Sequence, residues 1–369
     1  MQREFDTIVL GLGAMGSAAT YQLAKVGNRV MGIDQFNPPH SLGSSHGDTR
    51  ITRLAIGEGE QYTPLVLRSH ELWREIERES GREILVTTGG LIISSGAKTA
   101  INHVENFFEN TVDAAKKYGM NHELLTSDQI RNRFPQFNVK DDEEGYFEKE
   151  AGFVRPEEAI TAQLELAKKH GAGIRTEEKV LSYESNTEGV TVKTDKGEYT
   201  TSNLIITAGS WLPELIDKNL GQYFKVIRQV LYWFGAKDSI EPYLQKNFPI
   251  FIWELQGNKQ GIYGFPALDE STGVKIATEQ YETTTTPETV NRQVTEEETR
   301  AMFKNFVEPY FPGLSEHCLK SVACLYTVTP DSGFVIDRHP NHDNIIVASP
   351  CSGVCYFCWI SSSYSSWIA

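Results

Sequence analysis

The chain has 369 residues, more than one hydrophobic core usually organises, so its length predicts two domains. Hydrophobic residues make up 40% and charged residues 23% of the sequence, which is the balance of a globular protein. The formal net charge of -14 opposes contact with nucleic-acid phosphates and with anionic lipid, so we expect neither nucleic acid nor a membrane as a partner.

Targeting segments and the number of cysteines indicate in which cellular compartment a protein is found. The N-terminal residues lead into a strand without a basic and then apolar leader, and no stretch approaches the roughly 18 apolar residues of a spanning helix, so we expect a cytoplasmic protein. All five cysteines lie towards the C-terminus, and an odd, clustered set does not suggest a disulfide framework. Cys355 and Cys358 form a C-x-x-C pair without a second pair of ligands, so we expect no metal site; a redox pair is an equally weak alternative.

The predicted elements begin with a strand, a helix and a second strand. A short apolar run at 7–10 is typical of a buried strand, residues 14–26 have helical spacing, and 29–34 form the next strand. A loop rich in Pro, Gly and Ser follows at 35–47. Further helices are predicted at 64–79, 99–118, 157–169 and 296–310. Extended segments are predicted at 86–94, 187–209, 227–280 and 345–348, with a Thr-rich connector at 281–295.

Glycines at the start of the first predicted helix form a dinucleotide-binding motif. Gly11, Gly13 and Gly16 make the pattern G-x-G-x-x-G between a strand and a helix, and Asp34 ends the second strand. The first glycine permits a tight turn, the second lets the backbone approach a pyrophosphate, and the third lets the helix pack close to the sheet. Asp34 can accept hydrogen bonds from a ribose. The motif predicts a Rossmann-type site but does not separate FAD from NAD, and a tight turn without a ligand is the alternative.

Three later segments resemble flavoproteins of the glutathione-reductase type. The apolar strand 204–206 runs into Ala208 and Gly209, as does the strand that returns to the cofactor domain in those proteins. Val180 resembles the strand residue whose backbone meets the adenine half of the cofactor, and 331–337 resembles the return that contacts the flavin. The resemblance implies FAD as the cofactor.

The order of the predicted elements suits a discontinuous cofactor domain with a second domain inserted into it. We therefore expect a two-domain α/β fold, with a Rossmann-type FAD-binding domain and a substrate domain built mostly from an antiparallel sheet. The FAD-binding domain is expected at 1–85, 150–220 and 320–369, and the substrate-binding domain at 86–149 and 221–319.

A more specific resemblance is to the monomeric sarcosine oxidases and N-methyltryptophan oxidases. It is carried by segments from the N-terminus to about residue 353, at 44–53, 263–266, 273–275, 323–327 and 352–353. It implies an FAD-dependent oxidase that converts an N-methyl or other secondary amino acid to an imine. Water then hydrolyses the imine to an aldehyde and an amine, and oxygen is reduced to hydrogen peroxide. The expected partners are an amino acid substrate and oxygen, and the expected state is a monomer.

The same resemblance implies residues that contact the flavin. Cys324 matches the cysteine that carries the flavin through a thioether, and Thr49 and Arg50 match residues close to the flavin ring. Lys275 matches the lysine held over the flavin, where oxygen is reduced. Cations suit these places, because reduced flavin is anionic and oxygen reduction passes through superoxide. His46 is assigned to the cofactor loop, with the capping of a turn as the alternative.

Substrate-binding residues are implied in the same way. Arg53 matches an arginine that binds the substrate carboxylate, a group that arginine grips with two parallel hydrogen bonds. Tyr263 and Tyr326 match tyrosines that line the substrate cavity, where they supply apolar walls with polar tips. Tyr326, Arg50 and Lys275 are the residues expected to be catalytic.

Residue types alone permit simpler interpretations. Arg50 and Arg53 can be surface cations, Lys275 a solvated strand lysine and Cys324 a buried core cysteine. The enzyme also has rivals. One is a flavin oxidase or dehydrogenase for primary or D-amino acids, and another is a flavin-binding protein without turnover.

Three positions depart from the family pattern. Leu54 stands where the family usually has a histidine, and Glu279 falls where relatives carry an active-site histidine, which makes the amine pocket more acidic. In the C-terminal tail, Phe357 replaces the lysine that would be the second carboxylate ligand. Because no Lys, Arg or Glu follows Arg338, the tail suggests a change of reading frame. A native tail would leave Arg53 to hold the carboxylate alone.

Overall fold

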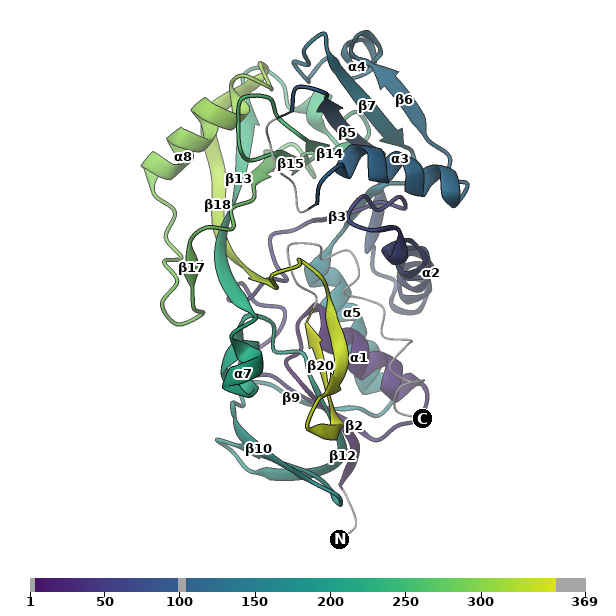
Figure 1. Cartoon of the computed structure of the whole chain (residues 1–369), viewed down its shortest axis with the longest axis vertical. Helices are drawn as coiled ribbons and strands as arrows, with labels where there is room; N and C mark the ends of the chain where they lie inside the picture. Colours follow the sequence, from purple (N-terminus) through teal and green to yellow (C-terminus); the bar gives the residue numbers. More distant parts are fainter. Residues whose placement is uncertain (1–3, 99–103, 350–369) are drawn as a thin grey trace.

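Three β-sheets and the helices around them make up the computed structural model, which describes residues 4–98 and 104–349. Figure 1 shows one sheet with α1 and α5 at one end of the elongated molecule and a second sheet with α3, α4 and α8 at the other. The expected α/β class is confirmed. None of the helices in the described part of the chain has the length and apolar character needed to cross a bilayer.

The first sheet has eight strands and contains the Rossmann start. Its strands follow the order β10-β11-β12-β1-β2-β9, with β20 beside β12 and β19 beside β20. Strands β1, β2, β9, β12 and β20 pair in parallel. Continuous apolar runs suit such strands, because helices or loops cover both faces of a parallel sheet. The bounds are β1 (Phe5–Leu10), β2 (Val30–Ile33), β9 (Gly173–Arg175), β10 (Val180–Asn186), β11 (Gly189–Thr194), β12 (Glu198–Ile206), β19 (Val335–His339) and β20 (His342–Ser349).

Three long helices cover this end of the molecule. They are α1 (Ala14–Lys25), α2 (Thr63–Ser80) and α5 (Pro156–Lys169). The small residues Ala18 and Ala19 are buried on α1, so this helix packs closely on the sheet and on α5. Each of the three helices lies within two residues of its predicted bounds.

The second sheet has nine strands in the order β17-β13-β16-β15-β14-β5-β7-β6, with β18 also paired to β13. Its pairs are antiparallel except for β14 with β5. An aromatic core fills one face and includes Phe137, Phe248, Phe251, Trp253 and Phe311. The bounds are β5 (Gly90–Ser95), β6 (Glu123–Thr126), β7 (Glu143–Glu148), β13 (Lys225–Ala236), β14 (Ile250–Trp253), β15 (Ile262–Phe265), β16 (Val274–Thr278), β17 (Thr284–Thr285) and β18 (Leu314–Val328).

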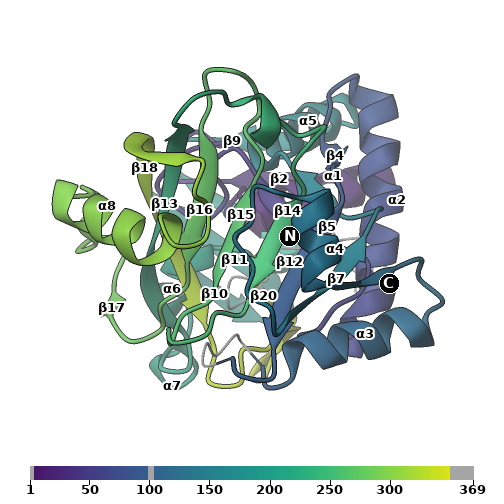
Figure 2. The ribbon, with the colours of Figure 1, turned by 90° about the horizontal axis from the view of Figure 1, so that it is seen from above.

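A three-stranded sheet lies between the two larger sheets and carries residues of the predicted site. It consists of β3 (Arg50–Thr52), β8 (Gly152–Val154) and β4 (Leu85–Thr87), in the order β3-β8-β4. Figure 2, seen from above, shows α2 and α8 on opposite sides of the molecule. The remaining helices are α3 (Phe107–Lys117), α4 (Ser127–Arg133), α6 (Leu212–Leu215), α7 (Lys218–Gly221) and α8 (Glu296–Met302).

Three predicted elements are divided or shortened. The strand predicted at 86–94 is broken between β4 and β5 at Gly89, whose φ of +78° leaves the extended region. The helix predicted at 99–118 begins at Phe107, and 99–103 lie outside the described residues. The helix predicted at 296–310 changes after Met302 to a π-helical turn at Phe303–Val307.

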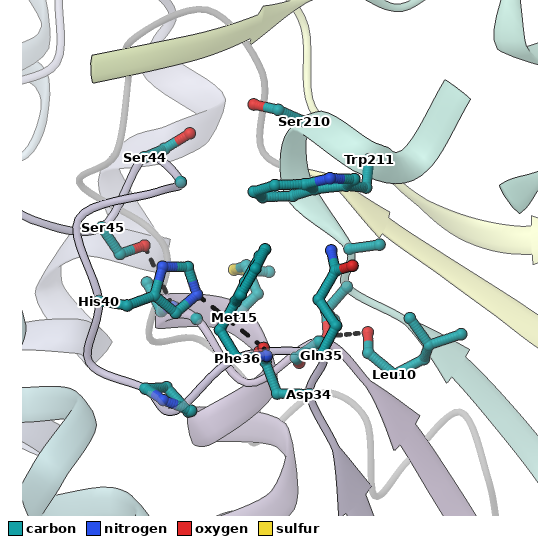
Figure 3. Close-up of a pocket in the computed structure, with 18 of the residues that line it drawn as sticks. Leu10, Met15, Asp34, Gln35, Phe36, His40, Ser44, Ser45, Ser210 and Trp211 are labelled. Atoms are coloured by element: carbon teal, nitrogen blue, oxygen red, sulfur yellow. Dashed lines mark hydrogen bonds and ion pairs between the residues drawn. The ribbon is translucent and has the colours of Figure 1, made fainter. Parts of the chain in front are cut away.

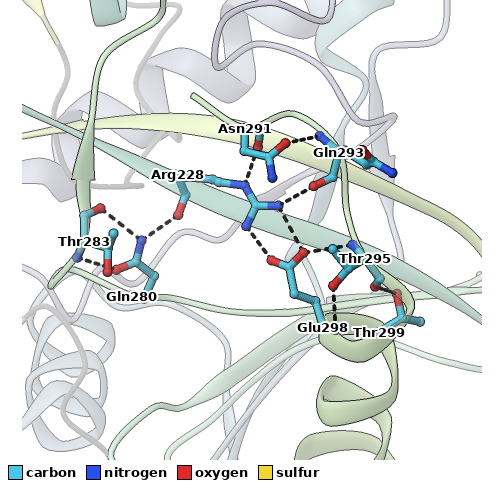
Figure 4. A network of polar contacts seen from close by, with 8 residues as sticks. All are labelled: Arg228, Gln280, Thr283, Asn291, Gln293, Thr295, Glu298 and Thr299. Carbon is cyan, nitrogen blue, oxygen red and sulfur yellow. Dashed lines mark hydrogen bonds and ion pairs between the residues drawn. The ribbon is translucent and has the colours of Figure 1, made fainter. Parts of the chain in front are cut away.

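The Thr-rich connector is held against β13 by one arginine (Figure 4). Arg228 donates from Nη1 to Oε1 of Glu298 at 2.6 Å and from Nε to the carbonyl of Asn291 at 2.6 Å. Gln280 donates from its side chain to the carbonyl of Arg228 at 2.7 Å. These bonds explain how a polar segment without long strands keeps a defined path.

One strand runs through a predicted domain boundary. The boundary at 320 falls inside β18, which stays paired with β13 as far as Val328. Strand β18 therefore extends from the nine-stranded sheet towards the eight-stranded one, and carries Cys324 and Tyr326 with it. The division into domains stays a prediction.

Candidate functional site

Two of the three glycines of the motif, Gly11 in the turn between β1 and α1 and Gly16 in the first turn of α1, have space for glycine alone. Gly11 has a φ of +89°, and a Cβ there would lie 2.7 Å from the Thr207 carbonyl oxygen. A Cβ on Gly16 would lie 1.7 Å from the carbonyl oxygen of Gly11. A Cβ on Gly13 would meet Ser45 Oγ at 3.5 Å, an ordinary contact. The first and third glycines therefore shape the turn, while Gly13 faces more open space.

Asp34 is buried at the end of β2 and holds the same turn. Its carboxylate accepts the N–H of Leu12 at 2.7 Å and the N–H of Phe36 at 2.8 Å. Burial raises the pKa of Asp34, and the two backbone hydrogen bonds oppose this rise. His40 Nε2 lies 3.9 Å from the carboxylate, and burial lowers the pKa of this histidine. His40 is a neighbour that the sequence motif did not predict.

One pocket extends from this turn to β18 (Figure 3). Gly11, Gly13 and Asp34 line one end, and Val180 lies in the same wall. Figure 3 shows Trp211 above Phe36 in this lining, and the two ring centroids are 5.4 Å apart. Residues from other segments complete the lining, among them Gly43, Ser44, Thr207, Ala208, Leu325 and Tyr326. The pocket therefore joins the predicted nucleotide end to the strand that carries Cys324.

Lys275 is 2% exposed and its ammonium is held by the loop before β3. Its Nζ donates to the Gly47 carbonyl at 2.7 Å, to the Thr49 carbonyl at 2.8 Å and to Thr49 Oγ1 at 3.1 Å. Burial and, after it, the positive charge of Arg50 lower the pKa of Lys275 well below its ordinary range. Lys275 is thus a fixed, buried amine and not a solvated strand lysine.

Arg50 and Cys324 meet beside this ammonium. Arg50 donates to the carbonyls of Thr49 and Ser44, and its Nη2 lies 3.7 Å from Cys324 Sγ. Cys324 is 1% exposed, and its sulfur lies 3.6 Å from the carbonyl oxygen of Ser44. Ser44 also lines the pocket, so the thiol and the guanidinium lie close to its inner end. The adjacent residues Thr49 and Arg50 are thus brought together with Lys275 and Cys324, which lie far from them in the sequence.

His46 is buried in the loop that surrounds these cations. Its Nε2 lies 3.1 Å from the carbonyl oxygen of Gly43. Burial and the charges of Arg50 and Lys275 lower the pKa of His46 to about 3. The ring is therefore neutral near pH 7, and the bond to Gly43 requires its proton on Nε2. His46 acts as a neutral donor that holds the loop beside Arg50.

Two tyrosine hydroxyls, one from β15 and one from β18, are paired near Cys324. The hydroxyl oxygens of Tyr263 and Tyr326 are 3.1 Å apart. Burial raises the pKa of both phenols, and the negative charge of Glu279 raises that of Tyr263 further. Tyr281 donates its hydroxyl to Glu279 at 3.1 Å. A carboxylate therefore lies within electrostatic reach of the tyrosine pair, at the position where the family pattern is broken.

Arg53 is 1% exposed and is not a surface cation. Its Nη2 donates to both carboxylate oxygens of Glu58, at 2.7 Å and 2.6 Å, and its Nη1 donates to the Ala55 carbonyl at 2.9 Å. Its guanidinium also lies 5.0 Å from the centroid of the Phe107 ring. The guanidinium thus already binds a carboxylate, which belongs to the protein.

The sequence analysis did not predict the acidic residues that surround the site. Glu58 pairs with Arg53, and Glu148 accepts the N–H groups of Leu54 and Ala55 at 2.6 Å and 3.1 Å. Glu157 accepts two N–H groups of the loop before β3. No motif marks these residues, because acidic side chains are common on exposed surfaces. Phe357, Cys355 and Cys358 lie outside the described residues.

Comparison with known proteins identifies the class. The sequence matches the family described as DAO, FAD dependent oxidoreductase, over residues 6–360. This match spans nearly the whole chain, so the protein belongs to the DAO family of FAD-dependent oxidoreductases. The expectation of an FAD-dependent enzyme is confirmed.

Curated relatives narrow this class to the amine oxidases expected from the sequence. The chain is 40% identical over 355 residues to a monomeric sarcosine oxidase of Streptomyces avermitilis, covering 96% of this chain and 90% of the relative. It is 38% identical over 356 residues to a monomeric sarcosine oxidase of Bacillus sp., covering 96% and 89%. It is 34% identical over 353 residues to an N-methyl-L-tryptophan oxidase of Shigella sonnei, covering 95% and 90%. The chain thus groups with these two kinds of oxidase.

Solved structures agree in fold. NikD, described as an unusual amino acid oxidase essential for nikkomycin biosynthesis, superposes with a TM-score of 0.82 at 18% identity, covering 100% of this chain and 94% of that one. Glycine oxidase from Geobacillus kaustophilus gives a TM-score of 0.75 at 16% identity, covering 99% and 94%. At these identities the likeness shows the fold alone.

The geometry of the pocket fits FAD. Gly13 leaves room for a ligand near the start of α1, where backbone N–H groups favour phosphate. Asp34 offers a buried carboxylate suited to ribose hydroxyls. Close to the inner end, the Arg50 guanidinium supplies positive charge beside the buried amine of Lys275, which suits a ring that becomes anionic on reduction.

Proposed function

We propose that this protein is an FAD-dependent oxidase of N-methyl or other secondary amino acids. The observation that carries the proposal is the meeting of Arg50, Lys275 and Cys324 around the loop at 44–49, whose Ser44 lines the dinucleotide pocket, together with the paired hydroxyls of Tyr263 and Tyr326. The overall reaction oxidises the amine to an imine, which water hydrolyses to an aldehyde and an amine, while oxygen is reduced to hydrogen peroxide. We further propose that the enzyme acts as a monomer.

The proposed cofactor contacts follow the pocket. Gly11, Gly13 and Gly16 shape the phosphate site, Asp34 holds the ribose, and Val180 lies along the adenine half. Cys324 is proposed to carry the flavin covalently. His46 and Thr49 hold the loop around the flavin end. When bound, FAD accepts two electrons from the amine and passes them to oxygen.

The protein's own residues prepare the substrate and the charge of the site. Tyr263 and Tyr326 form apolar walls whose hydroxyls can orient the amine. Their buried surroundings favour the neutral amine, which is the form that is oxidised. Arg50 stabilises negative charge on the reduced cofactor, and Lys275 stabilises negative charge on oxygen as it is reduced. Both cations are held by backbone carbonyls, so neither must reorganise during the reaction.

Carboxylate binding is proposed for Arg53 and requires a change of partner. In the structure Glu58 occupies both hydrogen bonds of Nη2. A substrate carboxylate can replace Glu58 because it offers the same charge and geometry. The affinity for the substrate carboxylate therefore depends on how much more strongly it binds Arg53 than Glu58 does, and not on the full strength of one ion pair.

Covalent attachment provides the test. The purified protein is denatured with acid and precipitated, and the absorbance of the pellet and supernatant is measured near 450 nm, a wavelength typical of flavins. Yellow colour in the pellet supports the proposal. In Cys324→Ala, colour is expected in the supernatant, while Cys318→Ala, an intermediate-exposure cysteine on the same strand, is the matched control. Absence of flavin from both the pellet and the supernatant would contradict the proposal.

The substrate class is tested separately. Release of hydrogen peroxide is measured with N-methylated and with primary amino acids, which distinguishes a secondary-amine oxidase from one that acts on primary amines.

A further inference from the structure

The turn formed by Gly47, Asp48 and Thr49 links Lys275 to helix α5. On one side, the carbonyls of Gly47 and Thr49 accept hydrogen bonds from Nζ of Lys275 at 2.7 Å and 2.8 Å. On the other side, Oε1 of Glu157 accepts the N–H of Gly47 at 2.7 Å and the N–H of Asp48 at 3.1 Å. Glu157 lies in the first turn of α5. The turn is therefore held between a buried amine and a carboxylate.

A single peptide group carries this link. The carbonyl of Gly47 and the N–H of Asp48 belong to the same peptide bond, which is trans, so they point in opposite directions. Lys275 binds the carbonyl end and Glu157 binds the N–H end. The peptide dipole is thus aligned between a cation and an anion. Hydrogen bonds aligned in this way polarise and strengthen one another in a buried site.

The backbone of the turn needs such contacts to persist. Gly47 has a φ of +93° and Asp48 a φ of +70°, so two successive residues are left-handed. A non-glycine residue in this region costs free energy that surrounding interactions must offset. Besides the bond to Glu157, the Asp48 side chain accepts Nζ of Lys320 at 2.7 Å. The turn is thus fixed from both sides.

The nine-stranded sheet supplies the opposite side. Trp233 on β13 lies in register with Lys275 on β16 and with Lys320 on β18. The two ammonium groups lie 5.4 Å and 4.5 Å from the Trp233 ring centroid. The sheet therefore binds the turn through the ammonium groups of two lysines, and α5 binds it through the carboxylate of Glu157.

Several charged groups surround the Lys275 amine. Burial and the charge of Arg50 disfavour its protonated form, while the carboxylates of Asp48 and Glu157, and Cys324 when it is a thiolate, favour it. His46 interacts with the same amine but is neutral near pH 7. Of the two carboxylates, Glu157 is the one that is joined to the ammonium through a shared peptide group.

We propose that Glu157 is a positioning residue for the Lys275 ammonium. It holds the turn so that the carbonyls of Gly47 and Thr49 face Nζ, and it supplies negative charge through the Gly47–Asp48 peptide. The inference rests on the proposed function in one respect, the use of the Lys275 charge in the reduction of oxygen.

The first test measures the amine itself. The variant Glu157→Gln keeps a carbonyl oxygen able to accept both N–H groups but removes the charge. Nζ of Lys275 is titrated by NMR in the flavin-loaded enzyme labelled with ¹⁵N-lysine, and the signal is assigned by its loss in Lys275→Met. The titration midpoint should fall by about one pH unit, a tenfold change in the protonation equilibrium. An unchanged midpoint in Glu157→Gln overturns the inference.

Glu158→Gln is the matched control. Glu158 is the next residue on the same helical turn, and its carboxylate accepts Nη1 of Arg82 at 2.7 Å. It makes none of the described hydrogen bonds to the turn at 47–49. The Lys275 midpoint should be unchanged in Glu158→Gln. An equal fall in both variants would mean that any acid at this helix terminus acts alike, and would overturn the specific role of Glu157.

The second test separates this inference from the proposed function. Reaction of the reduced enzyme with oxygen is followed by stopped-flow absorbance. At a pH above the Lys275 midpoint found by NMR, Glu157→Gln should slow this step by about tenfold, because a midpoint lower by one pH unit leaves about a tenth of the amine protonated, with little change in reduction by substrate. If Lys275→Met reacts with oxygen at the wild-type rate, the proposed role of Lys275 is wrong. The NMR titration still decides the role of Glu157.

Discussion

Arg53 and Glu58 form a buried ion pair, with Nη2 2.6 Å from Oε2 and side-chain exposures of 2% and 6%. The arginine assigned to the substrate carboxylate therefore carries a resident carboxylate five residues further along the chain. A buried charge must be paired, because isolated ions lose their hydration without compensation. Glu58 accordingly competes with the substrate for Arg53.

Glu58→Gln should strengthen carboxylate binding and weaken the fold. The substitution removes the competing charge, so a small carboxylate such as acetate should bind about tenfold more tightly, equivalent to about 1.4 kcal/mol. Without ligand, breaking a buried pair should cost about 3–5 kcal/mol of unfolding free energy. Flavin absorbance titration and urea unfolding measure the two effects. Glu60→Gln, in the exposed pair with Lys117, is the control. Unchanged acetate affinity in Glu58→Gln would contradict the competition.

Glu279→Gln should change the preference for substrate side chains. The carboxylate of Glu279 lies within electrostatic reach of Tyr263 and Tyr326, so it should repel a substrate with an acidic side chain. The ratio of kcat/KM for N-methylglutamate to that for N-methylglutamine should rise by about tenfold, or about 1.4 kcal/mol, when this charge is removed. The exposed Glu282→Gln should leave the ratio unchanged. A ratio that is equal in all three proteins would show that Glu279 does not face the side chain.

His46 should make the fold sensitive to acid. Its folded-state pKa of about 3 lies below the ordinary 6.5, so between these values the unfolded chain binds a proton that the folded chain does not. The free energy of unfolding should therefore fall by about 1.4 kcal/mol for each pH unit lost in this window through this group, with no further loss below about pH 3. His46→Asn should remove that part of the slope in urea unfolding at a series of pH values. The exposed His317→Asn should retain it. Parallel slopes for His46→Asn and wild type would refute the assignment.

Alanine at two glycines of the motif should have different consequences. A Cβ on Gly16 would lie 1.7 Å from the Gly11 carbonyl, so Gly16→Ala must displace α1 from β1. Such overpacking typically costs about 1–3 kcal/mol, and more where backbone has to move. A Cβ on Gly13 meets Ser45 Oγ at 3.5 Å, so Gly13→Ala should fold normally and lose dinucleotide affinity instead. Thermal unfolding and flavin content separate the two effects. Equal melting temperatures for the two variants would be inconsistent with this geometry.

Much of the fold could be predicted because its signals are local. The β1-turn-α1-β2 unit follows from consecutive residues, and Asp34 accepts the Leu12 N–H within the same short segment. Helices α2 and α5 follow from apolar spacing alone. The strand predicted at 86–94 is wrong as a single element, because Gly89 has a left-handed φ that apolar alternation does not reveal.

The residues of the candidate site were predicted largely by resemblance, but the acidic residues that hydrogen-bond to them or to their loop were not predicted. Lys275 and Cys324 were named, yet composition alone favoured a solvated lysine and an ordinary core cysteine. The ion pair of Glu58 and the double acceptor Glu157 carried no distinctive signal, because acids in loops and at helix starts are usually exposed.

By itself, the sequence determined the dinucleotide turn, since its glycines, helix start and acidic strand end are neighbours along the chain and local sterics settle their conformation. The charge of the inner site was decided by tertiary structure alone. Lys275 reaches the Gly47 carbonyl across 228 residues of sequence, and it does so because β16 pairs with β13 in a register that places its ammonium over the turn. Register and burial are set by packing between distant strands, and they convert an ordinary lysine into a fixed, buried amine with a lowered pKa.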